Sequence, residues 1–87
     1  MKLIIAIVRD SDSETVLHSL MTHNLRVTQI ASSGGFLRRG NSTLLVGVED
    51  EQLESTLQMI RENCKPAEGD ERRGVIFVIK VDQFIHF

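Results

Sequence analysis

Two short segments of this chain are apolar at positions that would face both sides of a strand. Residues 3–8 read Leu-Ile-Ile-Ala-Ile-Val, and residues 74–82 contain the run Val-Ile-Phe-Val-Ile. Continuous apolar runs rich in β-branched residues are typical of strands buried on both faces. Both runs are far shorter than the about 18 apolar residues of a membrane-spanning helix, so we predict no membrane span. Each strand therefore needs a covering layer on both sides, which restricts the folds open to a chain of 87 residues.

A first helix is predicted directly after the strand at 3–8. Ser11 and Glu14 have the spacing of a capping box at its start, and Asn24 is a suitable residue for its C-terminal cap. Between them, four apolar residues recur at helical spacing, and we expect them to face the core. They are Val16, Leu17, Leu20 and Met21.

A second helix is predicted after a further apolar strand at 43–48. Asp50 is expected to cap its start, where acidic residues suit the helix dipole, and Pro66 is expected to stop it. Its apolar stripe recurs at steps of four, three and four residues. The stripe consists of Leu53, Leu57, Ile60 and Cys64.

With another strand at 25–31, the elements follow the order β-α-β-β-α-β in a single domain, residues 1–87. Right-handed crossovers then give an α+β fold, the ferredoxin-like sandwich. Two helices can cover only one face of a four-stranded sheet. Because the other face is apolar too, we expect copies of the chain to associate sheet to sheet with closed symmetry.

Composition and residue types exclude several classes of function. A net charge of −2 argues against a protein that coats nucleic acid. A single cysteine, Cys64, allows neither an internal disulfide framework nor a thiolate zinc cage, and it indicates a cytoplasmic protein. His18 and His23 are five residues apart, which is not the spacing of a helical metal pair, so we expect both at the surface and no metal. Met59, like Met21, is expected to face the core.

The segment 32–41 is the most informative part of the sequence for function. It reads Ser-Ser-Gly-Gly-Phe-Leu-Arg-Arg-Gly-Asn. Adjacent glycines allow backbone N–H groups to converge on an anion, and Arg38 and Arg39 suit phosphate. Phe36 offers a surface on which a base can stack, and Asn41 has the paired donor and acceptor that an adenine edge requires. The residues alone leave two interpretations open: a nucleotide-binding loop, or a glycine turn with solvated arginines.

Three segments resemble the cyclic di-AMP receptor family of PII-like signalling proteins. They are the opening residues 1–8, the stretch 24–43 with its Gly-Gly-Phe-Leu-Arg…Gly-Asn block, and the C-terminal part 77–87. Members of that family are ferredoxin-like homotrimers that bind cyclic di-AMP in clefts between subunits. The resemblance therefore implies a non-enzymatic, cytoplasmic signalling protein that binds this cyclic dinucleotide, forms a homotrimer and acts on a downstream protein that the sequence does not name.

The resemblance also implies which residues contact the ligand. Phe36 and Leu37 would pack on a purine face, and Gly47 would leave room for a base to approach the backbone. At the position of the family's glutamine before the terminal phenylalanine this chain has His86. The full implied set is Arg26, Thr28, Gly35, Phe36, Leu37, Asn41, Gly47, Phe77 and His86.

The chain also departs from the family in the loop between the second helix and the last strand. That loop is long in the family and is the part expected to signal, whereas here only residues 65–73 span the gap. One alternative is therefore a PII-like trimer that binds another adenine nucleotide, ATP or ADP, or that has lost ligand binding. A second is an acyl-phosphate hydrolase, which residues 9–12 disfavour because they offer one arginine and no glycine to cradle a phosphate. No catalytic triad or paired-carboxylate pattern stands out, so we do not expect an enzyme.

Overall fold

The computed structural model describes residues 1–32, 40–66, 69 and 72–87. Within these residues the chain forms four strands, two α-helices and a short 3-10 helix that leads into the second α-helix. In chain order they are β1 (Lys2–Arg9), α1 (Asp10–Thr22), β2 (Arg26–Ser32), β3 (Asn41–Val48), η2 (Asp50–Gln52), α2 (Leu53–Glu62) and β4 (Gly74–Lys80). The predicted β-α-β-β-α-β order is confirmed.

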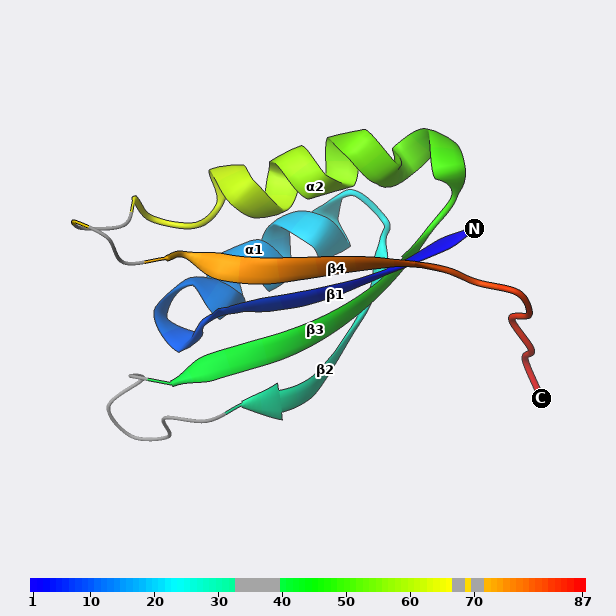
Figure 1. Ribbon diagram of the computed structural model, residues 1–87, viewed down its shortest axis with the longest axis horizontal. Helices are drawn as coiled ribbons and strands as arrows, with labels where there is room; N and C mark the ends of the chain where they lie inside the picture. Colours follow the sequence, from blue (N-terminus) through cyan, green and yellow to red (C-terminus); the bar gives the residue numbers. More distant parts are fainter. Residues whose placement is uncertain (33–39, 67–68, 70–71) are drawn as a thin grey trace.

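The strands form one sheet in the order β2-β3-β1-β4, and every neighbouring pair is antiparallel. On the central strand β1, Ile5 lies opposite Leu45 of β3 on one side and Phe77 of β4 on the other. Both helices lie against the same face of this sheet (Figure 1). The protein thus has two layers, with one helix-covered face and one open face.

The hydrophobic core lies between the helices and the covered face. Every second residue of β1 and β3 points into it, as the two-residue repeat of a strand requires. The strands contribute Ile4, Ala6, Val8, Leu44, Val46 and Val48, and the helical side contributes Val16, Leu20, Leu57, Ile60 and Cys64. The apolar stripe predicted for the second helix is thereby confirmed, with Leu53 packed against its edge.

The start of α1 differs from the predicted capping box. The helix begins at Asp10 with Arg9 in the N-cap position, so Ser11 and Glu14 lie within the helix, and no side-chain hydrogen bond caps it among the described residues. The reason is a stronger interaction nearby. The Arg9 guanidinium forms a two-pronged ion pair with the buried carboxylate of Asp12, at 2.8 and 2.7 Å. This pair fixes the first turn of the helix without a cap.

The start of the second helix also differs, because Asp50 is not its cap. Glu49 holds the N-cap position of η2 and forms a capping box with Gln52, whose Oε1 accepts from the Glu49 N–H at 3.1 Å. The carboxylate of Asp50 instead pairs with the N-terminal amine at 3.2 Å and with the Lys2 ammonium at 3.4 Å. These two cations lower the pKa of Asp50 below its ordinary value.

Two predictions at the side and end of α1 have different outcomes. Met21 was expected to face the core but is 59% exposed, so that prediction is wrong. The core side of α1 is narrow, and Val16 and Leu20 fill it. Asn24 follows the C-cap residue His23 and has a φ of 63°, a left-handed conformation that asparagine adopts readily at a helix end.

Candidate functional site

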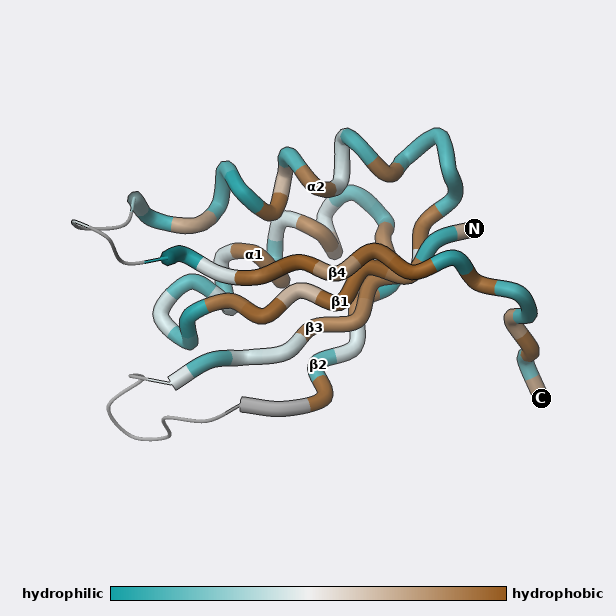
Figure 2. Tube along the Cα trace, viewed as in Figure 1, coloured by the Kyte–Doolittle hydropathy of each residue, from teal (hydrophilic) through white to brown (hydrophobic). Residues whose placement is uncertain are grey.

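The open face of the sheet is as apolar as the covered one, and the described residues leave much of it exposed. Figure 2 shows the hydrophobic stretches of β1, β3 and β4 side by side. The side chains of β1 on this face are half-buried, while Val75, Phe77 and Ile79 of β4 are 44%, 53% and 46% exposed. Toward the β2 edge the face becomes polar, because Arg26 and Thr28 lie there, opposite Gly47 and Leu45.

The C-terminal tail, residues 81–87, crosses one end of the sheet from the β4 edge to the β2 edge. At its start, the Val81 N–H donates to the carbonyl of Met1 at 3.2 Å. Near its end, Nη1 of Arg26 lies 3.1 Å from Nε2 of His86. Since β4 and β2 are the two outer strands, these contacts place the tail across the ends of the strands between them. Figure 1 shows the tail continuing beyond the end of β4.

A cavity of about 900 Å³ lies between this tail and the open face. Its volume is in the upper part of the range usual for small-molecule sites, about 300 to 1,000 Å³. The sheet and the N-terminus contribute Met1, Leu3, Arg26, Thr28, Leu45 and Gly47, and the tail contributes Val81, Gln83, Phe84 and His86.

Gly47 forms a bare patch in the wall of this cavity. In the register of the sheet it lies between Arg26 of β2 and Leu3 of β1. A Cβ added at Gly47 would meet no atom within 4 Å, so glycine is not required there by packing within this chain. The backbone of β3 is therefore open to a flat group that approaches the sheet at this point.

The C-terminal tail brings His86 to Arg26. A guanidinium only donates hydrogen bonds, so the 3.1 Å contact is a hydrogen bond when Nε2 of His86 accepts. The ring of Phe84 packs edge-on against this imidazole, with centroids 4.9 Å apart. The tail thus places the rings of Phe84 and His86 next to the Arg26 guanidinium, in the cavity that Leu3 and Leu45 also line.

Eight of the nine residues predicted for the site fall into three groups. Arg26, Thr28, Gly47 and His86 line the one cavity between the tail and the open face. Phe77 lies on the same open face, next to Ile5, but does not line the cavity. Gly35, Phe36 and Leu37 lie outside the described residues, so the structure does not place them.

Asn41 is not brought to the cavity within one chain. It is the first residue of β3, whereas Gly47 is near its end. Six residues of extended strand separate them by about 20 Å. Asn41 and Gly47 have the same parity along the strand and so lie toward the same face, at opposite ends of it.

The sequence analysis missed other residues that line the cavity: Met1, Leu3, Leu45, Val81, Gln83 and Phe84. The two-residue repeat of the strands could have placed Leu3 and Leu45 on the face of Arg26 and Thr28. No repeat covers the tail, which forms no helix or strand. Its residues could be found only by knowing where the chain turns after β4.

The other candidate groups lie apart from this cavity. Cys64 is buried, and burial raises the pKa of its thiol. His18 and His23 are exposed, as predicted. Across the ranges that the structure describes, no cluster of three or more metal-ligating side chains occurs. No helix in those ranges is both long and apolar enough to cross a membrane.

Two comparisons with known proteins bear on the fold and the family of this chain. A crystal structure of a functionally unknown protein from Pediococcus pentosaceus ATCC 25745 is similar to this chain over 99% of its length and 96% of the other chain, with a TM-score of 0.80 and 32% identity. The family model described as cyclic-di-AMP receptor matches residues 1–70, which include Arg26, Thr28 and Gly47. Phe77 and His86 lie beyond the matched residues. The chain therefore belongs to the cyclic-di-AMP receptor family.

Proposed function

We propose that this protein is a non-enzymatic, cytoplasmic signalling protein that binds cyclic di-AMP on the open face of its sheet. The observation that carries the proposal is the cavity under the C-terminal tail. It gathers Arg26, Thr28, Gly47 and His86 from two strands and the tail, which are separated widely in the sequence. Membership of a receptor family supports a binding role for the same surface.

The chemistry of the cavity suits a nucleotide with an anionic backbone. The Arg26 guanidinium carries several N–H donors for a phosphate oxygen, and it can also stack on a purine ring. The Thr28 hydroxyl and the His86 imidazole both donate and accept, so each can bond to a base edge. Gly47 lets a base lie against the backbone of β3, with Leu3 and Leu45 as apolar neighbours.

We further propose that the protein is a homotrimer with its ligand sites between subunits. The apolar open face supports association, since burial of each aliphatic side chain contributes about 1.5 to 3 kcal/mol. The position of Asn41 supports shared sites. Asn41 lies about 20 Å along the strand from Gly47 of the same chain. The Asn41 of a neighbouring copy can therefore contact a ligand at Gly47 more directly.

A second candidate is a trimer that binds ATP or ADP in place of cyclic di-AMP, or that binds no nucleotide. The contact between Arg26 and His86 favours the loss of nucleotide binding, because the tail of the chain itself already engages the guanidinium. A ligand that needs Arg26 must displace or share this contact.

Titration calorimetry with cyclic di-AMP, ATP, ADP and cyclic di-GMP separates these candidates. We expect cyclic di-AMP to bind tightest and Arg26→Gln to weaken it by about tenfold, the loss of one hydrogen bond to a charged group. Arg72→Gln removes an equal charge from a residue outside the cavity and should leave the affinity unchanged. Tightest binding of ATP or ADP would favour the second candidate. Equal losses of affinity in Arg26→Gln and Arg72→Gln would show that the nucleotide does not bind in this cavity.

A further inference from the structure

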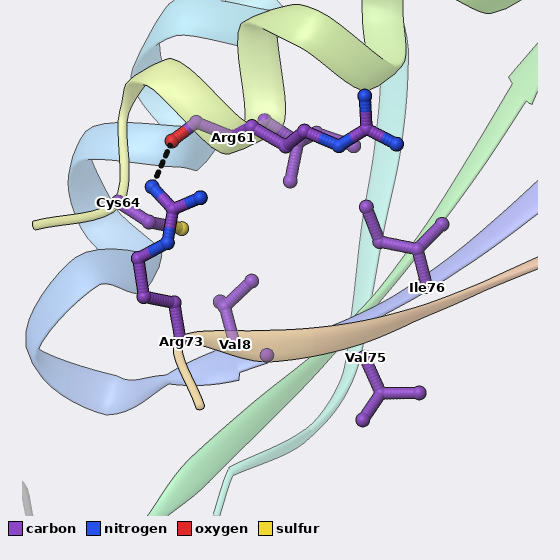
Figure 3. A pocket seen from close by; sticks show the side chains of 8 residues that line it. Val8, Arg61, Cys64, Arg73, Val75 and Ile76 are labelled. Atoms are coloured by element: carbon purple, nitrogen blue, oxygen red, sulfur yellow. Dashed lines mark hydrogen bonds between the residues drawn. The ribbon is translucent and has the colours of Figure 1, made fainter. Parts of the chain in front are cut away.

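A second cavity, of about 320 Å³, lies on the helix side of the sheet, between the end of α2 and the start of β4. It shares no residue with the cavity under the C-terminal tail. Figure 3 shows the residues that line it, which come from β1, from α2 and the residue two positions beyond it, and from β4 and the residue before it. They are Val8, Ile60, Arg61, Cys64, Arg73, Gly74, Val75 and Ile76. The Val75 side chain points away from α2, toward the open face.

The floor of this cavity is apolar. Val8 and Ile60 are almost fully buried, and Ile76 packs against the same core. Beside them, a Cβ added at Gly74 would come within 2.5 Å of the carbonyl oxygen of Ile7, so β4 can approach β1 here only without a side chain.

The mouth of the cavity carries two guanidinium groups. Nη1 of Arg73 donates to the carbonyl oxygen of Arg61 at 3.1 Å, which holds the Arg73 side chain across the gap between β4 and the end of α2. The Arg61 side chain extends from α2 away from Arg73, so the two guanidinium groups lie apart (Figure 3). The carbonyl that anchors Arg73 is at the negative end of the helix dipole, which stabilises a cation there.

None of the described residues that line the cavity is acidic. The carboxylate of Asp12 acts electrostatically on the Cys64 thiol. Arg9 already pairs with this carboxylate, at 2.7 Å. Burial raises the pKa of the Cys64 thiol, so the thiol is neutral at pH 7 and forms part of the apolar wall. Within the described residues, the cavity therefore combines two arginines at its mouth with an apolar interior.

We propose that this cavity binds a small organic carboxylate with an aliphatic body. Each guanidinium presents paired N–H donors that match a carboxylate, and the interior offers apolar contacts to the body behind it. The site is independent of the proposed nucleotide function, because it lies on the other face of the sheet.

The test is a titration of the uniformly ¹⁵N-labelled protein with sodium hexanoate, followed by amide resonances. We expect saturable shifts at the amides of Ile60, Cys64 and Gly74, and none at Arg26 or Gly47. Hexanamide, which has the same body without the charge, should bind about tenfold more weakly, as for a lost charged hydrogen bond. Acetate, which lacks the apolar body, should also bind more weakly than hexanoate.

Arg61→Gln and Arg73→Gln should each weaken hexanoate binding by about tenfold, while Arg72→Gln, a charge next in sequence that does not line the cavity, should not. If Arg73→Gln unfolds the chain because it loses the Arg73 contact to α2, Arg61→Gln still tests the proposal, since it keeps the backbone carbonyl that Arg73 contacts. Absence of saturable shifts, equal binding of hexanamide, or equal effects of all three variants would overturn the proposal. Because cyclic di-AMP is not used, failure here leaves the nucleotide proposal untouched.

Discussion

The two faces of the sheet are built from equally apolar residues and have very different surroundings. Leu44 and Leu45 are neighbours in β3, yet Leu44 is fully buried under the helices while Leu45 faces the open side and is only half-buried. On β1, Ile4 and Ile5 differ in the same way. An apolar residue in a strand thus indicates that its face of the sheet is unfavourable to expose to water. It does not indicate what covers that face.

The largest expected effect comes from truncating the two neighbouring leucines. Leu44→Ala should lower the free energy of unfolding by about 2 to 5 kcal/mol, because it leaves a cavity in a closed core. Leu45→Ala removes the same atoms from the open face and should cost less at low protein concentration. In an assembly that covers this face, its cost should rise with concentration.

Urea unfolding at two protein concentrations measures both effects. Equal losses for the two variants at every concentration would contradict the distinction between a closed and an open face.

The elements of the fold could be predicted because local patterns specify them. Alternating and continuous apolar runs predicted all four strands, and the stripe ending at Cys64 predicted the second helix. Helix starts were predicted less well. Ser11 and Asp50 have the right residue type for caps, but each prediction failed because the chain brings other partners to the helix start: Arg9 pairs with Asp12, and Lys2 pairs with Asp50. Local sequence cannot rank such competing interactions.

The candidate site could be predicted only in part. The strand repeat places Arg26 and Thr28 on one face, and the family resemblance adds Gly47 and His86. The path of the tail follows no periodic pattern, so the role of Phe84 beside His86 became visible only in three dimensions. Asn41 is separated from the cavity by the length of β3, which a sequence motif does not reveal.

The next effect is on assembly, and it uses neighbouring residues of β4. Phe77 lies on the open face and is 53% exposed, whereas Val78 lies on the helix side and is 42% exposed. Phe77→Lys should dissociate the proposed trimer to monomers of 9.8 kDa, because it places a charge in a buried interface. Val78→Lys should not. Light scattering on size-exclusion fractions measures the mass, and a trimer in both variants would rule out sheet-to-sheet assembly.

A smaller effect tests how well the helix side is closed. Burial raises the pKa of the Cys64 thiol, and only the thiolate reacts with iodoacetamide. Alkylation of the native protein should therefore be slower than that of the urea-unfolded chain at pH 8, and its pH profile should lie at higher pH. Mass spectrometry of timed samples gives the rates. A native rate equal to the unfolded rate would show that this side is open to solvent.

The central claim is that cyclic di-AMP binds the open face and not the helix side. The most direct measurement is a titration of methyl- and amide-labelled protein with cyclic di-AMP, followed by nuclear magnetic resonance. We predict shifts at the Leu45 and Thr28 methyl groups and at the amides of Arg26 and Gly47, with the Leu44 methyl groups almost unchanged. Shifts centred on Leu44 and the helices, or no shifts at saturating nucleotide, would contradict the account.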